Sequence, residues 1–385
     1  MITNTHVSTP YTFSVFETIE RIARHARDEG IAALGINDVN TLDGFKDFMA
    51  GCRSHGIYPL FNVGFLVRCE DDRIGGGHGH PDEMRAIRNV HGKALRYPAT
   101  LSGDSRNLIA SIWKASQDRI WKMIDLLNQI CENRHLAVSL NYNDIRSSFA
   151  KGSLLDRHLA RALYASIISQ AEEKGDRLDL LRRLFDDDSF DGDLADTSKM
   201  EQEIHFRLLT QGKQAYVDEP THSFMNFFQA KQVILQAGGI PCYQCSFDGA
   251  DEATVGSKGP AVLAKHLTDK GILAVEFITR QTTFEVLNEY MHYFDAQYFC
   301  VTAGTGPPAW SPGSLVPTTI DGRPLDEALN AITYRGACIL AAHQELHQQK
   351  RRGFIDETGK RIITPDQISE LIQIGDQAIA RAVTR

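Results

Sequence analysis

Seven short apolar runs, separated by segments of helical periodicity, are the feature that most constrains the fold of this chain. Each run is continuous in Val, Ile, Leu and Ala rather than alternating with polar residues, which is typical of parallel strands buried on both faces. Repeated strand–helix units of this kind indicate an α/β protein built on a parallel sheet. The runs cover residues 31–36, 57–63, 136–140, 239–243, 272–278, 298–303 and 337–342.

Helices are expected between these runs. In residues 15–29, for example, Ile19, Ile22 and Ala26 follow the 3.6-residue period, and Gly30 ends the pattern. The other expected helices cover residues 41–55, 107–133, 154–173, 222–237, 258–271, 282–295 and 324–336.

The last segment of the chain, residues 361–385, predicts one more helix. Thr364 can cap it, with Pro365 in the first turn and Gln367 at the third position, which is a capping-box pattern. Its apolar positions form a single stripe, so we expect this helix to dock on the rest of the molecule.

We predict one barrel domain over residues 1–360, with the C-terminal helix of residues 361–385 docked on it. Two insertions interrupt the strand–helix alternation. Residues 66–106 contain a glycine- and histidine-rich stretch, and residues 174–200 contain an acidic stretch that we expect to be a solvated loop. The predicted fold class is α/β: a distorted βα barrel of about seven parallel strands, with loop insertions and a C-terminal helix.

Composition and charge exclude several classes of protein. The net charge of −8 argues against a broad nucleic-acid-binding surface. No apolar run approaches the roughly 18 residues needed to span a bilayer, and the first residues lack the regions of a signal peptide. The seven cysteines are scattered, which favours a reducing cytoplasm over a disulfide framework. We therefore expect a cytoplasmic protein that binds neither nucleic acid nor a membrane.

Functional groups of a parallel barrel gather where its strands end at their carboxyl termini. Polar side chains that follow the apolar runs are therefore candidates for binding a small-molecule ligand at the barrel mouth. These candidates are Asn40, Cys245, Glu276, Arg280 and His343.

The chain has one C-x-x-C pair, Cys242 and Cys245. A zinc ribbon would need a second such pair, and a thioredoxin-like pair would open a helix. Here we expect Cys242 inside a buried strand and Cys245 just past its end. Chemistry at Cys245, or at the pair, is the weakest of the functional hypotheses.

Five segments, in order along the chain, resemble the PHP (polymerase and histidinol phosphatase) superfamily. The resemblance spans residues 3–345 and implies a distorted barrel of about seven βα units. It also implies up to three divalent metals at the barrel mouth that activate water for phosphoester hydrolysis. The segments are "NTHVST" (4–9), "IAALGINDVNTLDG" (31–44), "GSLLDRHLARALY" (152–164), "ILQAGGIPCYQCSFDGA" (234–250) and "FCVTAGTGPP" (299–308).

Most of the metal-ligand positions implied by this resemblance are substituted. His6, Asp38 and His158 keep ligand-type side chains, and they could hold one Zn, Mn or Fe ion but not three. Each also has a structural alternative: His6 and Asp38 could hydrogen-bond the backbone at strand ends, and His158 could cap a helix or join an ion pair. Other residue types stand at the remaining implied positions: Ser8, Val39, Gly64 or Phe65, Cys245, Gly306 and Pro308.

Two functional hypotheses follow. The first, favoured on this chemistry, is a PHP-like barrel whose hydrolytic site is largely lost and which binds a small molecule or acts as a scaffold, without a metal. The alternative is a metal-dependent hydrolase, such as a phosphoesterase, that acts on a phosphorylated or sugar-like small molecule through a single divalent metal. Whether the chain is an enzyme is left open by its sequence.

Overall fold

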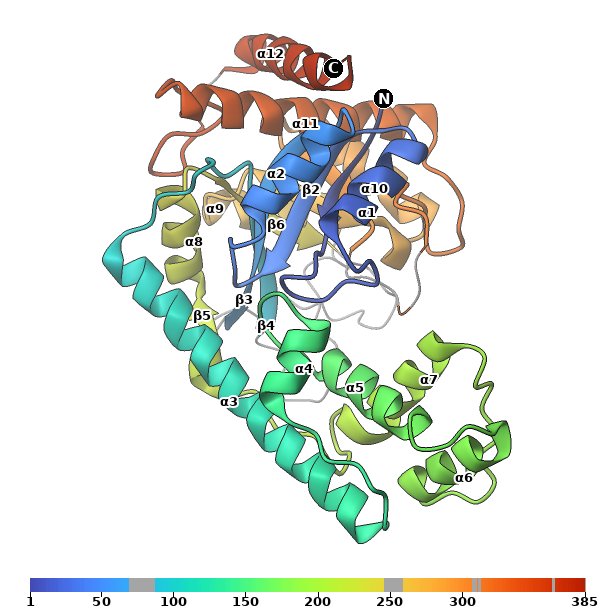
Figure 1. Ribbon diagram of the computed structural model, residues 1–385. Helices are drawn as coiled ribbons and strands as arrows, with labels where there is room; N and C mark the ends of the chain where they lie inside the picture. Colours follow the sequence, from blue (N-terminus) through green and yellow to red (C-terminus); the bar gives the residue numbers. More distant parts are fainter. Residues whose placement is uncertain (69–86, 246–258, 307–309, 311–312, 362–363, 385) are drawn as a thin grey trace.

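A strongly curved sheet forms the centre of the molecule and curls into a nearly closed barrel (Figure 1). The computed structural model describes residues 1–68, 87–245, 259–306, 310, 313–361 and 364–384. In order around the barrel, the strands are β1 (Ile2–Val7), β2 (Ile31–Val39), β3 (Tyr58–Arg68), β4 (Ile87–Lys93), β6 (Ile240–Cys245), β7 (Ala274–Ile278) and β8 (Cys300–Gly304). A short strand, β5 (Met225–Asn226), pairs with the end of β3. The predicted α/β barrel is thus confirmed.

The barrel closes where β1 meets β8. The hydroxyl oxygen of Thr5 on β1 lies 3.1 Å from the carbonyl oxygen of Ala303 on β8. Gly304 makes this approach possible, because a Cβ atom at that position would collide with the Cβ atom of His6. Glycine at a site of close backbone approach is a recurrent way to bring two strands together.

One strand of the barrel, β4, runs antiparallel to both of its neighbours, β3 and β6. The other strand pairs of the barrel are parallel. A Cβ atom at Gly92 would lie 2.9 Å from Ile234 of helix α8, so this position faces outward. Because side chains alternate along a strand, His91 and Lys93 face the interior of the barrel. Strand β4 lies within residues 66–106, so the prediction that this whole segment is an insertion was wrong.

Helices cover the outside of the barrel and extend beyond it. None of those in the described ranges combines the length and apolar character needed to cross a membrane. The helices are α1 (Ile19–Asp28), α2 (Phe45–Ser54), α3 (Gly103–Asn133), α4 (Tyr142–Phe149), α5 (Asp156–Ile168), α6 (Lys174–Phe185), α7 (Thr197–Ile204), α8 (Phe227–Gln236), α9 (Pro260–Asp269), α10 (Phe284–Ala296), α11 (Glu327–Gln348) and α12 (Pro365–Val383).

Helix α11 covers the amino-terminal end of the barrel (Figure 1). Residues 337–342, predicted as a strand, lie inside this helix, and their small side chains pack against the strand ends. Contact is so close at Gly336 that a Cβ atom there would collide with the carbonyl oxygen of Val301. A short, fully buried helix segment and a buried strand have the same apolar composition, which explains the wrong prediction.

Two further predictions were wrong in the helical region between β4 and β6. Residues 136–140, expected as a strand, form no strand, and their alternate apolar side chains join the core of helices α3–α7. Residues 174–200 are not one solvated loop, because they contain α6 and the start of α7. Leu180, Leu181 and Leu184 of α6 are buried in the same core. In Figure 1, α3 descends past the barrel and α4–α7 lie below it.

The predicted C-terminal helix is confirmed as α12. The side-chain oxygen of Gln367 accepts a hydrogen bond from the backbone N–H of Thr364 at 3.0 Å, as a capping box requires. The helix packs along α11 (Figure 1) and also contacts β2 and β3 of the barrel.

A matched pair of substitutions tests the close contact between α11 and β8. Gly336→Ala is expected to lower the free energy of unfolding by about 1–3 kcal/mol, because the new methyl group collides with Val301. Gly175→Ala, in helix α6 where a Cβ atom has no neighbour within 4 Å, is expected to be neutral or to stabilise by about 0.4–1 kcal/mol. Urea unfolding of both variants measures the difference. Equal effects would show that the contact at Gly336 is not tight.

Candidate functional site

A polar cluster fills the interior of the barrel, with Glu276 of β7 at its centre. Oε2 of Glu276 lies 2.9 Å from Nδ1 of His6 on β1 and 2.9 Å from Nδ1 of His91 on β4. The two imidazole rings meet edge to face, with centroids 5.1 Å apart. In the described part of the chain, this is the one group of three His, Cys, Asp or Glu side chains whose ligand atoms all lie within 4.8 Å of one another.

Lys93 compensates the charge of Glu276. Its Nζ atom lies 2.6 Å from Oε1 of Glu276, and both side chains are 0% exposed. The same Nζ atom donates to the carbonyl oxygen of Thr5 at 3.1 Å, and the hydroxyl of Thr5 donates to Oε1 of Glu276 at 2.6 Å. The barrel interior therefore holds one anion and one cation in direct contact, each with further hydrogen bonds, as buried charges require.

Burial and charge set the protonation states in this cluster. Burial alone would raise the pKa of Glu276, but the ammonium group of Lys93 and the imidazole of His6 outweigh it and hold that pKa well below its ordinary value. Burial lowers the pKa of His91 to about 4, because the interior disfavours a second proton on the ring. At neutral pH, Glu276 is therefore an anion and His91 is neutral.

Asn37 of β2 and Gly64 of β3 border the same cluster. Nδ2 of Asn37 lies 3.3 Å from Nε2 of His6, whereas Oδ1 of Asn37 is buried and has no hydrogen-bond partner among the described residues. Gly64 pairs with His91 across the two strands. A Cβ atom at Gly64 would lie 3.3 Å from Nδ2 of Asn37 and 3.7 Å from Nε2 of His91. The glycine thus leaves a small space beside both side chains.

Asp38, one of the three metal-ligand candidates from the sequence, makes other contacts. Its carboxylate accepts hydrogen bonds from the backbone N–H of Thr9 at 2.8 Å, from the hydroxyl of Thr9 at 2.5 Å and from the hydroxyl of Thr12 at 2.6 Å. Burial raises the pKa of Asp38 to about 6, although these hydrogen bonds act in the opposite direction. Asp38 thus ties the segment after β1 to the end of β2 and lies outside the group formed around His6.

His158, the third metal-ligand candidate, lies at the start of α5. Its Nδ1 atom accepts a hydrogen bond from the backbone N–H of Leu155 at 2.9 Å, and its ring meets Phe13 edge to face with centroids 5.1 Å apart. Burial lowers the pKa of His158 to about 3. The side chain therefore caps the helix, which is the structural alternative considered for it from the sequence.

Two candidates for the barrel mouth, Cys245 and His343, are buried. Cys245 ends β6 and is buried, and burial raises the pKa of its thiol. His343 lies in α11, at the opposite end of the barrel from the mouth. Its Nδ1 atom accepts from the N–H of Phe354 at 3.0 Å, so its Nε2 atom donates to the carbonyl oxygen of Gly238 at 3.1 Å. His343 thus links α11 to the backbone of Gly238 and to the backbone of Phe354 through a neutral ring.

Asn40 and Arg280 lie at the carboxyl-terminal rim of the barrel. Asn40 follows β2 directly and has a left-handed backbone with φ of 57°. Arg280 lies in a helical turn, Thr279–Gln281, that follows β7, and it donates to the carbonyl oxygen of Ser314. Burial lowers the pKa of Arg280, and the carboxylate of Glu29 opposes that change.

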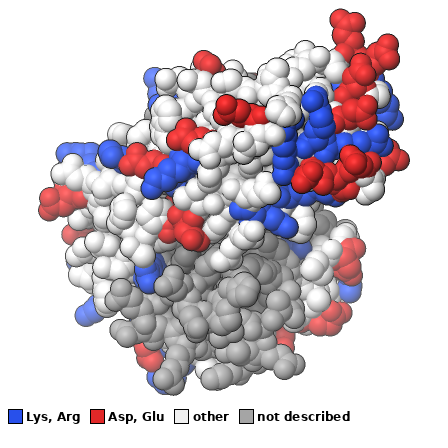
Figure 2. All heavy atoms as spheres, turned by 90° about the horizontal axis from the view of Figure 1, so that it is seen from below, with Lys and Arg blue, Asp and Glu red and all other residues white. Residues whose placement is uncertain are grey.

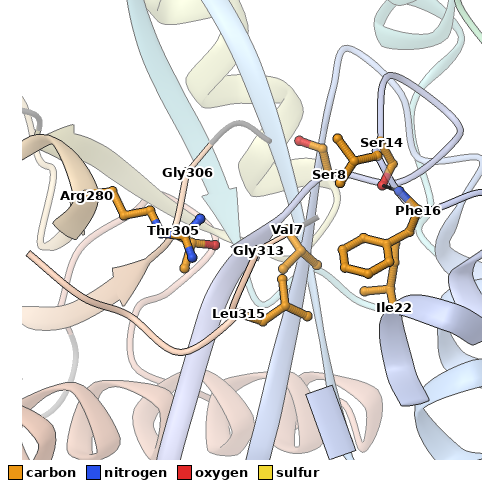
Figure 3. A pocket seen from close by; sticks show the side chains of 11 residues that line it. Val7, Ser8, Ser14, Phe16, Ile22, Arg280, Thr305, Gly306, Gly313 and Leu315 are labelled. Atoms are coloured by element: carbon orange, nitrogen blue, oxygen red, sulfur yellow. Dashed lines mark hydrogen bonds between the residues drawn. The ribbon is translucent and has the colours of Figure 1, made fainter. Parts of the chain in front are cut away.

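A pocket opens beside Arg280, at the ends of β1 and β8 (Figure 3). It encloses about 410 Å³, including its open mouth. Arg280 and Thr305 lie on one side of the pocket, and Ser8, Ser14 and Phe16 lie on the other. A guanidinium group that faces hydroxyl groups across a pocket is suited to an anionic ligand. The other lining residues are Val7, Val15, Ile22, Gly306, Gly313 and Leu315.

Figure 2 views the molecule from the end toward which the parallel strands point. On the described residues seen from this side, acidic and basic side chains are intermixed, and no large area of a single charge stands out.

His6 and Glu276 are candidates predicted from the sequence, whereas His91 and Lys93 are functional residues that were not predicted. A usable signal was present, because His91 and Lys93 alternate with Val90 and Gly92. This two-residue period is typical of a strand with one polar face. Continuous apolar runs predict strands buried on both faces, and this short alternating segment does not have that pattern.

The chain matches no protein-family model and no curated protein. Two solved structures share its fold. One is described as a "putative metal-dependent phosphoesterase" from Bifidobacterium adolescentis. Its sequence is 15% identical to this chain, and the match covers 86% of this chain and 95% of that chain with a TM-score of 0.52. The other is an amidohydrolase from Chromobacterium violaceum with bound sulfate and no metal, at 14% identity, 86% and 97% coverage and a TM-score of 0.52. The chain thus shares its overall fold with these two structures.

Removal of Lys93 tests the buried ion pair. Lys93→Met is expected to lower the free energy of unfolding by about 3–5 kcal/mol, because Glu276 is left as an unpaired buried carboxylate. The double variant Lys93→Met/Glu276→Gln removes both charges and is expected to recover much of that loss. Denaturant unfolding of the single and double variants provides the comparison. A double variant no more stable than Lys93→Met would show that charge compensation is not the role of Lys93.

His158→Gln tests the capping role of His158 through the pH dependence of stability. The folded state binds the proton of His158 less tightly than the unfolded state, so stability is lost as pH falls from about 6.5 toward 3. Glutamine can accept the same hydrogen bond but does not titrate. Between pH 7.5 and 4.5 the variant is expected to lose about 2–3 kcal/mol less than the parent chain in urea unfolding, with similar stability at pH 7.5. An unchanged pH profile would contradict this role.

Proposed function

We propose that this chain is a divergent PHP-like hydrolase that acts through a single divalent metal ion at the cluster of His6, His91 and Glu276. The convergence of two imidazoles and one carboxylate inside the barrel is the observation that carries the proposal. Two histidines and a carboxylate are a common ligand set for one Zn, Mn or Fe ion that keeps open positions for water and substrate.

The side chains of the cluster fit a metal ion in charge and protonation. A ligand must present a lone pair, and His91 is neutral at physiological pH while Glu276 is ionised. When bound, a divalent ion would supply an activated water molecule for hydrolysis. Lys93 and Thr5 hold the carboxylate of Glu276 in place, so the orientation of both imidazoles is fixed before any ion binds.

A single ion fits this chain better than the three that the PHP resemblance implies. Two close divalent ions repel each other and need several anionic ligands between them. Asp38 already accepts three hydrogen bonds, and the Nδ1 lone pair of His158 accepts one. Glu276 is then the one carboxylate available near His6 in the described residues.

A small phosphorylated or sugar-like molecule is the proposed substrate. The pocket beside Arg280 is suited to a phosphate or another anionic group, with the hydroxyl groups of Ser8 and Ser14 opposite the guanidinium. The six described cysteines are all free and buried, which supports the reducing cytoplasm that we propose as the protein's location.

The second candidate function is a metal-free barrel that binds a ligand or serves as a scaffold. The ion pair of Lys93 and Glu276 favours it, because the ammonium group neutralises the carboxylate without any metal. The same ammonium group would repel a nearby cation, at a cost that rises as the local dielectric constant falls. The metal content of the purified protein therefore distinguishes the single-metal hydrolase from the metal-free barrel.

Purified without chelator and without a polyhistidine tag, the chain is expected to retain about one divalent ion, because three ligands converge in the barrel. His6→Ala and His91→Ala are each expected to lower metal content or affinity at least about tenfold. His158→Gln serves as a matched control and is expected to leave it unchanged. Elemental analysis measures the ion, and a panel of phosphoesters, assayed with and without chelator, measures the reaction.

The proposed hydrolase would be contradicted by a metal content below about 0.1 ion per chain after incubation with Zn²⁺, Mn²⁺ and Fe²⁺, together with no turnover of any phosphoester. The metal-free barrel that binds a ligand would then remain as the proposed function.

A further inference from the structure

The carboxylate of Glu276 is saturated with hydrogen bonds. Its Oε1 atom accepts from Lys93 and from Thr5, both at 2.6 Å, and its Oε2 atom accepts from His6 and His91, both at 2.9 Å. A carboxylate offers about four lone-pair positions, so none remains for a metal ion while these four contacts hold.

These contacts also fix the tautomers of both histidines. An ionised carboxylate only accepts hydrogen bonds, so the Nδ1 atoms of His6 and His91 must carry the protons that they share with Glu276. In a neutral ring whose proton is on Nδ1, the free lone pair is on Nε2. Each ring therefore presents the lone pair of its Nε2 atom, on the side away from Glu276.

The amide of Asn37 lies on that side. Its Nδ2 atom is 3.3 Å from Nε2 of His6, and the residue is 1% exposed. Its Oδ1 atom is buried without a partner among the described residues, a state that costs about 1–3 kcal/mol. Rotation of the amide by half a turn would exchange the two atoms and place the oxygen beside Nε2 of His6.

The spacing suits two ligands of one ion. Two ligand atoms that each lie about 2.1 Å from a Zn²⁺ ion at tetrahedral angles are separated by about 3.4 Å. The observed separation of the Asn37 amide and Nε2 of His6 is 3.3 Å. Gly64 keeps the neighbouring space open, and that space also borders Nε2 of His91.

We propose that a single divalent ion binds to Nε2 of His6, Nε2 of His91 and the side-chain oxygen of Asn37, while Glu276 stays outside the coordination sphere and orients both imidazoles. This assignment rests on the proposed metal-dependent function, and it replaces Glu276 by Asn37 in the ligand set because Glu276 already accepts four hydrogen bonds. Metal-bound histidines commonly donate their other N–H to a carboxylate in this way. The arrangement also keeps Glu276 between the ion and the ammonium group of Lys93.

Nitrogen-15 NMR of chains labelled at histidine tests the assignment without any activity measurement. Before metal is added, His6 and His91 are both expected to show a protonated Nδ1 and an unprotonated Nε2. One equivalent of Zn²⁺ is expected to shift the Nε2 resonances of these two rings and to leave Nδ1 protonated. The variants His6→Gln and His91→Gln assign the signals.

Two substitutions beside the ion give an independent measurement of Zn²⁺ affinity by calorimetry. Asn37→Asp supplies an anionic oxygen and is expected to tighten binding at least about tenfold. Gly64→Ala fills the open space and is expected to weaken binding at least about tenfold, although its new contacts of 3.3 Å or more are tolerable for folding. Gly175→Ala is the matched control and is expected to change nothing. Circular dichroism of each variant verifies folding.

The outcomes distinguish this assignment from the proposed function. The assignment is overturned if Zn²⁺ binds and displaces the Nδ1 protons. It is also overturned if Zn²⁺ binds but Asn37→Asp and Gly64→Ala leave its affinity unchanged. Either result would leave a metal-dependent hydrolase in which Glu276 is a ligand. No binding of Zn²⁺, Mn²⁺ or Fe²⁺ to the parent chain would overturn both.

Discussion

The charge of one carboxylate inside the barrel is the constraint on which the rest of the structure depends. Glu276 is fully buried, and an isolated anion there would be prohibitively unfavourable. The chain compensates it with Lys93 and surrounds it with His6, His91 and Thr5, and these four partners come from two strands, β1 and β4. Barrel closure at Gly304 and the inward-facing side of β4 both place these partners within hydrogen-bond distance. Folding and the candidate site therefore share the same contacts, and a change to one member affects stability as well as chemistry.

The sequence predicted the architecture because most of its strands are buried on both faces. Continuous apolar runs identified β2, β3, β6, β7 and β8, and helical periodicity identified most of the helices that cover them. Apolar runs gave wrong strand predictions where a buried segment is not a strand. Residues 337–342 are as apolar as a strand but lie in a helix that covers the barrel end, and residues 136–140 pack into a helical core without forming a strand. Periodicity alone cannot separate these cases over five or six residues, because so short a run fits either structure.

The candidate site was only partly predictable, for a different physical reason. His6 was named from the PHP resemblance and Glu276 from its place near the end of an apolar run, but nothing local indicates that they face each other. Their convergence depends on the curvature of the whole sheet and on β4, whose direction the sequence does not reveal. Lys93 was invisible to a search for metal ligands, since an ammonium group has no free lone pair. Its role is electrostatic and is recognised only when its buried partner is known.

The direction of β4 has a further consequence for the shape of the molecule. Because this strand runs against its neighbours, the chain leaves it at the end of the barrel covered by α11, far from the rim where the parallel strands finish. A long element is then needed to return, and α3 has 31 residues, which at 1.5 Å per residue extend about 46 Å. That length carries the chain past the whole barrel and brings α4–α7 below it, as Figure 1 shows. The helical region is thus the result of a topological requirement: one reversed strand sets the length of the longest helix and the place where an additional layer of structure can be built.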